Sequence, residues 1–253
     1  MVNSSLYNSV FGIQNGGGGR GGKEVAKNVS SLFYEKRELL VKTFANLIFQ
    51  LGITYYAMEK FSKEDKDGEK DGEKDGEKDK YNNGITILAV IYMFAFIIIL
   101  GLIPMPSWLK FILFCIFSYA GGFIFSGLKR VAGEEVIHTA LIGTMSIFAI
   151  MFSIGAFVLL SGIRLGFRTA ILLFYGLLFL IIAQLVNIFM VHTSAVSKGL
   201  TIFGLILFSL YIIYDTNQIL QKNYYGDFIT ASLDYYLDII NIFTNLLSLN
   251  GDN

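Results

Sequence analysis

The sequence predicts an all-α, polytopic membrane protein: a bundle of seven transmembrane helices with a polar last helix at its centre. Of the 253 residues, 54% are hydrophobic and only 16% are charged. Of the 40 charged residues, 26 lie in residues 1–84 and 14 in residues 85–253. A soluble domain carries about 25% charged residues. The composition therefore excludes an ordinary soluble enzyme and a binder of nucleic acid through a basic face.

Apolar runs of membrane-spanning length follow one another along the chain, and each needs about 20 mostly apolar residues. Six clear runs cover residues 40–58, 85–103, 107–127, 137–160, 169–191 and 199–219. A seventh run, 230–249, is ambiguous because it contains two acids and two asparagines. Most connections are short, so neighbouring helices should be antiparallel. Strands are excluded because the runs are too long for the strands of a closed barrel, and lipid otherwise tolerates only helices.

The charged segments separate an N-terminal tail and one long loop from the apolar part of the membrane domain. Residues 1–37 are rich in glycine and are expected to form a flexible cytosolic tail, and residues 38–250 form the membrane domain. Within it, residues 61–84 form a solvated loop that repeats Asp-Gly-Glu-Lys three times. Basic residues flank membrane helices on the cytosolic side. They predict a cytosolic N-terminus, with Lys110, Arg164, Arg168 and Lys222 on the same side.

Acidic residues inside the last two runs are the strongest functional signal, because ionisable groups at membrane depth are costly. Asp215 lies in the sixth run, and Asp234 and Asp238 lie in the seventh. Asp215 and Asp238 could lie at similar depth, toward the cytosolic side. Two carboxyl groups in contact cannot both ionise cheaply and would share one proton, so all three acids are candidate gate or pH-sensing residues. When ionised, Asp215 and Asp238 would suit a transient calcium ion.

Amide and phenol side chains on several runs are candidate pore-lining residues. In the seventh run, polar residues recur every three or four positions, which places them on one face of a helix. We expect these faces to point at a shared interior, although polar residues that merely join helices are the alternative. The candidates are Asn241, Asn245, Gln218, Tyr211, Asn46, Gln50, Gln184 and Asn187.

Two segments resemble the Bax inhibitor-1 family, also called the transmembrane Bax inhibitor motif or lifeguard family. Residues 210–216, LYIIYDT, are similar to its YDT segment, and residues 236–243, YLDIINIF, are similar to its late LYLDIINLF signature. Residues 42–50, KTFANLIFQ, resemble its first helix more loosely. This sequence departs from the family in two ways. It adds Asp234 as a third carboxylate, and its second run lacks the basic residue that some relatives carry.

The resemblance implies a seven-helix fold with a central last helix. It also implies a pH-sensitive calcium leak in an intracellular membrane, linked to protection from cell death, with Asp215 and Asp238 as the paired aspartates. The expected membrane is that of the endoplasmic reticulum or Golgi. The expected partners are lipid, calcium ions and apoptosis-regulating membrane proteins, without nucleic acid. We expect no cofactor, because calcium would be the permeant ion.

Two other functions remain open. A non-conducting protein that binds other membrane proteins and regulates apoptosis would need neither aspartate. An intramembrane aspartyl protease would use Tyr214-Asp215 and Asp238, but the Gly-x-Gly typical of such enzymes around the second aspartate is absent. We therefore expect no enzymatic activity.

Overall fold

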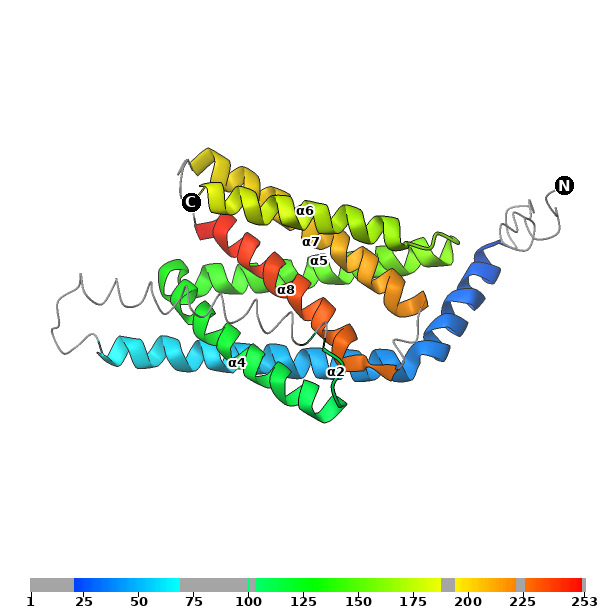
Figure 1. Cartoon of the computed structure of the whole chain (residues 1–253), viewed down its shortest axis with the longest axis horizontal. Helices are drawn as coiled ribbons and strands as arrows, with labels where there is room; N and C mark the ends of the chain where they lie inside the picture. The colour runs from blue at the N-terminus through cyan, green and yellow to red at the C-terminus, as the bar shows by residue number, and fades with distance from the viewer. Residues whose placement is uncertain (1–20, 69–99, 101–102, 188–193, 222–225, 252–253) are drawn as a thin grey trace.

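The chain folds into a bundle of long helices (Figure 1). The computed structural model describes residues 21–68, 100, 103–187, 194–221 and 226–251. The helices are α2 (Gly21–Gly68), α4 (Ser107–Ala132), α5 (Glu134–Leu160), α6 (Phe167–Val186), α7 (Ser194–Gln221) and α8 (Phe228–Gly251). The described residues contain no strand, so the all-helical class is confirmed.

The expected count of seven membrane-spanning helices is not reached in the part of the chain that the structure describes. Six helices are present there, and most of the helix expected at 85–103 lies outside the described residues. Four helices are long and apolar enough to cross a membrane: α4 over Ser107–Lys129, α5, α6 and α7. These four make the chain a multi-pass membrane protein. Helices α2 and α8 are not among these four, because their polar and charged residues lower the mean hydropathy.

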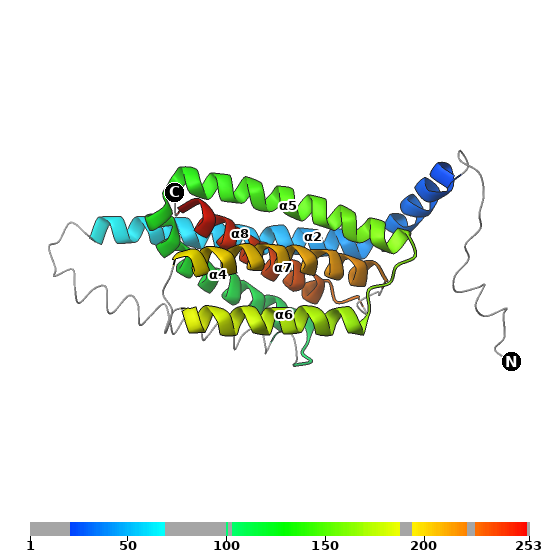
Figure 2. The same cartoon turned by 90° about the horizontal axis from the view of Figure 1, so that it is seen from above.

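Large apolar side chains cover the outer surface of the bundle, as expected for helices that face lipid. On α6, Leu172, Phe174 and Phe179 are exposed, and on α5 so are Ile142 and Phe157. A soluble protein rarely exposes so large an apolar surface. Helix α6 packs chiefly on α7, at the edge of the bundle (Figure 2). The apolar residues of α6 are therefore explained by contact with lipid.

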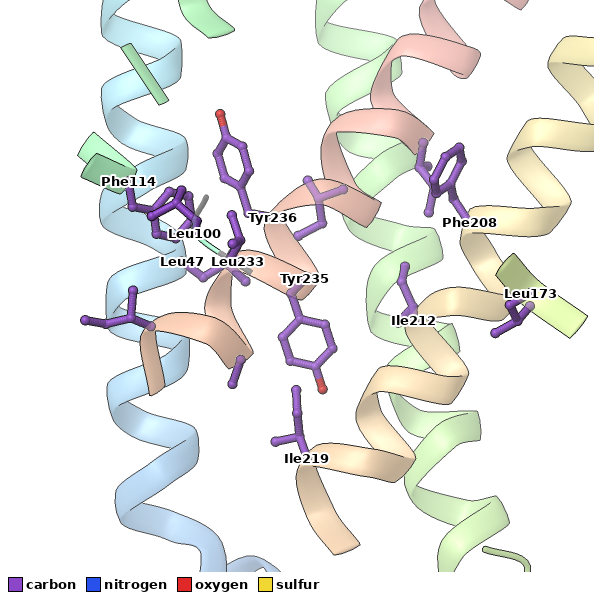
Figure 3. Close-up of a cluster of buried hydrophobic side chains, with 14 of the residues drawn as sticks. Leu47, Leu100, Phe114, Leu173, Phe208, Ile212, Ile219, Leu233, Tyr235 and Tyr236 are labelled. Atoms are coloured by element: carbon purple, nitrogen blue, oxygen red, sulfur yellow. The ribbon is translucent and has the colours of Figure 1, made fainter. Parts of the chain in front are cut away.

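Helix α8 lies at the centre of the bundle, as expected for the last helix. It contacts α2, α4, α5 and α7. Two adjacent, fully buried tyrosines, Tyr235 and Tyr236, project from it in opposite directions (Figure 3). The Tyr235 ring stacks on Phe44 of α2, with centroids 6.0 Å apart, and the Tyr236 ring meets Phe114 of α4 edge-on at 5.2 Å. Aromatic packing therefore holds α8 on two sides.

Helix α2 extends beyond both ends predicted from the sequence, into the expected tail 1–37 and into the expected loop 61–84. It begins at Gly21, so residues 21–37 are helical rather than a separate tail, and it ends at Gly68, inside the expected loop 61–84. Leu32 and Phe33 explain the first difference, because both pack against the hydrophobic core. Tertiary packing thus extends the helix beyond the apolar run. Residues 1–20 and 69–84 lie outside the described residues.

Glycines allow two pairs of helices to approach closely, a common device in membrane bundles. A Cβ atom at Gly155 of α5 would lie 2.7 Å from the Ile213 carbonyl oxygen and 2.8 Å from Thr216 Cβ, both on α7. A Cβ atom at Gly122 of α4 would clash with the Thr54 carbonyl oxygen of α2. Neither position accepts a side chain unless the helices separate.

An ion pair fixes the start of α8 to the start of α4. Lys110 Nζ lies 2.6 Å from Asp227 Oδ2 and also donates to Thr230 Oγ1. Asp227 caps α8, since its Oδ1 accepts a hydrogen bond of 3.0 Å from the Thr230 backbone N–H. Burial raises the pKa of Asp227, but the hydrogen bonds from Lys110 and Thr230 outweigh it and hold the pKa below its ordinary value.

Replacing Gly155 with alanine should destabilise the bundle by about 1–3 kcal/mol, because the added methyl group overpacks the α5–α7 contact. The measurement is the thermal unfolding midpoint of the purified protein in detergent. Gly199→Ala on α7 is the matched control, since a Cβ atom there meets no atom within 4 Å. Equal midpoints for the two variants would contradict this packing.

Replacing Asp227 with alanine should cost about 1–2 kcal/mol at neutral pH, because the helix cap is lost together with its ion pair. Since the folded-state pKa of Asp227 is lowered, its stabilisation is present above the ordinary carboxyl pKa and is lost as the pH falls through the lowered value. The difference in unfolding midpoint between wild type and Asp227→Ala should therefore shrink below about pH 4. A constant difference down to pH 2 would show that Asp227 stabilises independently of its charge.

Candidate functional site

Two buried carboxyl groups meet between α7 and α8. The side chains of Asp215 on α7 and Asp238 on α8 lie close enough to each other for a hydrogen bond between their carboxyl groups. Asp215 is 9% exposed and Asp238 is 4% exposed. The two helices follow one another along the chain and run antiparallel, which brings the two positions to the same level. We call these two residues the aspartate pair.

The surroundings of the aspartate pair are partly polar. The Tyr235 hydroxyl donates a hydrogen bond of 3.0 Å to Thr216 Oγ1, which closes the α7–α8 contact beside the pair. Tyr211 and Asp234 lie close enough to interact electrostatically with both aspartates. Asp238 Oδ2 is buried and has no hydrogen-bond partner among the described residues. One oxygen of the pair is thus free to accept a hydrogen bond or to contact a cation.

The third carboxylate does not complete a metal centre with the aspartate pair. Within the described ranges, no three His, Cys, Asp or Glu side chains are grouped closely enough to hold a metal ion. Calcium takes six to eight oxygen ligands. Two carboxyl groups alone supply fewer oxygen atoms than that.

The polar residues of α2 do not share an interior with the aspartate pair, contrary to expectation. Asn46 Nδ2 donates to Ser232 Oγ at 2.5 Å, so Asn46 lies against a different face of α8. Ser232 and Tyr236 are four residues apart and share that face. Asp234 lies about 200° around the helix from Ser232, given 3.6 residues per turn. The bundle consequently has polar groups on two opposite faces of α8.

The hydrogen bonds at the α2–α4–α8 contact are largely satisfied internally. Ser118 Oγ of α4 donates to Gln50 Oε1 at 2.8 Å, and Gln50 Nε2 lies 3.3 Å from Asn46 Oδ1. The hydroxyl groups of Thr54 and Tyr236 are 2.6 Å apart. Such a network joins helices, which is the alternative that the sequence left open for Asn46 and Gln50.

The remaining candidates of α8 lie along the same face as Asp238. Asn241 Nδ2 donates to the Leu237 carbonyl oxygen, and Asn245 Nδ2 donates to that of Asn241, each at 2.7 Å. Asn245 also packs on Gly204 of α7, where a Cβ atom would lie 2.9 Å from its Oδ1. Both amides therefore lie at or near the α7–α8 contact and extend the polar face beyond the pair.

Gln184 and Asn187 lie apart from the aspartate pair, and Gln218, one turn along α7 from Asp215, is hydrogen-bonded elsewhere. Gln184 is exposed on the outer surface of α6. Asn187 donates to Ser197 Oγ at 2.8 Å, near the start of α7 and about 27 Å along that helix from Asp215 at 1.5 Å per residue. Gln218 is buried, and its amide donates to the Leu165 carbonyl oxygen in the α5–α6 loop. Helical periodicity could not exclude these residues as pore-lining candidates, because it does not show which neighbouring helix a given face contacts.

The structure adds Thr216 and Tyr235 to the site. Thr216 follows Asp215 directly, and Tyr235 lies between Asp234 and Asp238. Both are fully buried. For Tyr235 the sequence contained a usable signal: a tyrosine next to an acidic residue in an apolar run. A buried phenol usually finds a hydrogen-bond partner, so such a tyrosine could have been expected near the acids.

Comparison with known proteins gives one family match over most of the chain and several shorter matches to curated proteins. The family described as "Inhibitor of apoptosis-promoting Bax1" matches residues 36–253. The Golgi anti-apoptotic protein of Vaccinia virus (strain Lister) is 42% identical over 77 residues, which are 30% of this chain and 32% of that protein. Protein LIFEGUARD 1 of Arabidopsis thaliana is 38% identical over 79 residues, covering 30% and 33% of the two chains.

A longer match of lower identity links the chain to a fungal protein. Bax inhibitor 1 of Schizosaccharomyces pombe is 27% identical over 168 residues, which are 63% of this chain and 59% of that protein. The chain spans about a third of the length of the first curated relatives that it matches. The family match from residue 36 to residue 253 includes α4 to α8 and most of α2. The chain therefore belongs to the Bax inhibitor family.

Proposed function

We propose that this protein is a pH-sensitive calcium leak channel of an intracellular membrane, gated by the aspartate pair. The observation that carries the proposal is the direct contact of two buried carboxyl groups across the α7–α8 interface. Ionisable groups in a membrane domain are costly and therefore point to function. Amides would join the two helices at lower cost.

The proposed gate depends on one proton. A hydrogen bond between two carboxyl groups needs a proton on one of them, and the pair then titrates as a unit. While the proton is shared, Asp215 and Asp238 attract each other and join α7 to α8. When it is lost, two like charges face each other in a medium of low dielectric constant and repel. The α7–α8 contact would thus depend on pH.

The proposed calcium path follows the polar face of α8. Ionised carboxylates are hard oxygen ligands that suit calcium, and Asp238 Oδ2 has no hydrogen-bond partner among the described residues to compete with an ion. Asn241 and Asn245 continue this face. Asp234 and Tyr211 lie near the pair and would influence its charge. Calcium would be the transported ion, and we propose no resident cofactor and no enzymatic activity.

The relatives' names support a role in cell death. One viral relative is named an anti-apoptotic protein of the Golgi, and a yeast relative is named Bax inhibitor 1. We propose that the present chain also modulates apoptosis from the membrane of the Golgi or endoplasmic reticulum, with its N-terminus in the cytosol. Its partners would be lipid, calcium and apoptosis-regulating membrane proteins. A non-conducting interaction protein would fit the same names.

Calcium flux should depend on pH in the wild type, and Asp238→Asn should abolish that dependence. An amide at position 238 hydrogen-bonds Asp215 without a shared proton, so the gate no longer has its coupled carboxyl pair. The measurement is calcium entry into proteoliposomes loaded with a calcium-sensitive dye, between about pH 5 and 8, a range spanning that of physiological switches. The wild type should vary several-fold over this range.

The matched control is Glu135→Gln, which removes an exposed carboxylate at the start of α5. Its pH profile should be that of the wild type. A wild-type profile in Asp238→Asn, or a flat profile in Glu135→Gln, would refute gating by the pair.

A cell-death assay should separate the channel from a non-conducting interaction protein. If the leak carries the function, Asp215→Asn/Asp238→Asn should lose both its pH-dependent flux and its effect on the survival of stressed cells. Expression level and membrane location of the variant are measured in parallel. Survival at the wild-type level, with the pH-dependent flux lost, would favour the interaction protein.

A further inference from the structure

The corner where α5 turns into α6 carries an unpaired basic surface on a rigid backbone. We call it the basic corner: Ile163, Arg164, Phe167 and Arg168. All four side chains are exposed, Phe167 at 80% and Ile163 at 55%. Among the described residues, no carboxylate forms an ion pair with either arginine. This corner thus presents two positive charges interleaved with two apolar side chains.

Amide side chains of α7 hold the backbone of this corner from the inside. The Leu165 backbone N–H donates to Asn217 Oδ1 at 2.9 Å, and Asn217 Nδ2 donates to the Ile163 carbonyl oxygen at 3.1 Å. Gln218 and Gln221 both donate to the Leu165 carbonyl oxygen. The residues on both sides of Arg164 are therefore bound to α7, while Arg164 itself points to the surface.

The ends of α5 and α6 also restrict this corner. Gly162 closes α5 with a positive φ of 85°, and its N–H donates to the Leu159 carbonyl oxygen. The Gly166 carbonyl oxygen accepts the first backbone hydrogen bonds of α6, from Thr169 and Ala170. The backbone that carries the two arginines is consequently held in place, which lowers part of the entropy cost of binding a ligand.

The corner lies at the end of two helices that can span a membrane, where a ligand would be a lipid headgroup. Both α5 and α6 are apolar enough to cross a membrane, so the residues between them lie at the level of the lipid headgroups. Arginine binds phosphate oxygens through two parallel N–H groups. Exposed apolar side chains beside basic residues insert into the boundary between headgroups and acyl chains.

We propose that the basic corner is a binding site for an anionic phospholipid such as phosphatidylserine. Arg164 and Arg168 bind the headgroup phosphate and its anionic substituent, and Ile163 and Phe167 contact the upper part of the acyl chains. The amides of Asn217, Gln218 and Gln221 act as positioning residues. Anionic lipids are concentrated in cytosolic leaflets, the side on which the proposed orientation places this corner. The site does not depend on the proposed calcium leak.

The test is a titration of the full-length protein, in phosphatidylcholine nanodiscs, with fluorescent short-chain phosphatidylserine. Phosphatidylserine should bind more tightly than the matching phosphatidylcholine probe. Arg164→Gln and Arg168→Gln should each weaken its binding about fivefold, as expected for one basic residue near anionic lipid. Both arginines are exposed, and unchanged helical circular dichroism would verify that the variants fold.

Lys198→Gln is the matched control, because Lys198 is an exposed basic residue near the start of α7, at the opposite end of that helix. It should change the binding of phosphatidylserine less than twofold. Equal binding of the two lipids, wild-type affinity in both arginine variants, or an equal loss in Lys198→Gln would overturn the proposal.

Discussion

A helix with carboxyl, amide and phenol groups lies at the centre of a membrane bundle, so its neighbours must satisfy those groups. Unsatisfied polar groups are expensive away from water. Helix α8 meets this requirement on two opposite faces. Ser232 and Tyr236 hydrogen-bond to α2, whereas Tyr235 hydrogen-bonds to α7 and the Asp238 carboxyl group lies close to that of Asp215. The apolar helices α5 and α6 face a simpler requirement, because their outer surfaces need only expose apolar side chains to lipid.

The two faces of α8 differ in a way that separates stability from function. On the α2 side, neutral amides and hydroxyl groups form a connected network that holds the helices together. On the α7 side, two carboxyl groups meet, and one oxygen of Asp238 has no partner among the described residues. A neutral network has no charge state to change. A carboxyl pair can change its charge state by gaining or losing a proton. For this reason we assign the switching role to the α7–α8 contact.

Much of the site could be predicted, because the physical cost of an acid in an apolar run can be read from composition alone. Asp215 and Asp238 were identified in this way, and antiparallel helices joined by a short turn suggested their equal depth. Asn46, Gln50, Gln184 and Asn187 could not be assigned to the correct surface. Periodicity shows that residues share one face of a helix, but not which helix packs there. The start of α2 was missed because Leu32 and Phe33 gain their stability from tertiary contacts.

The lengths and composition of the apolar runs are enough to predict the class of the protein: an all-helical, multi-pass membrane protein with a few costly acids in its last two runs. These properties follow from local composition and from the fixed thickness of a bilayer. The packing of the helices was needed to show that α8 separates two polar contacts and that Asn217 and Gln218 hold the α5–α6 corner. Such a hydrogen bond joins specific atoms of residues that lie far apart in the sequence. Its partners are therefore fixed by how the helices pack rather than by the residues of any single helix.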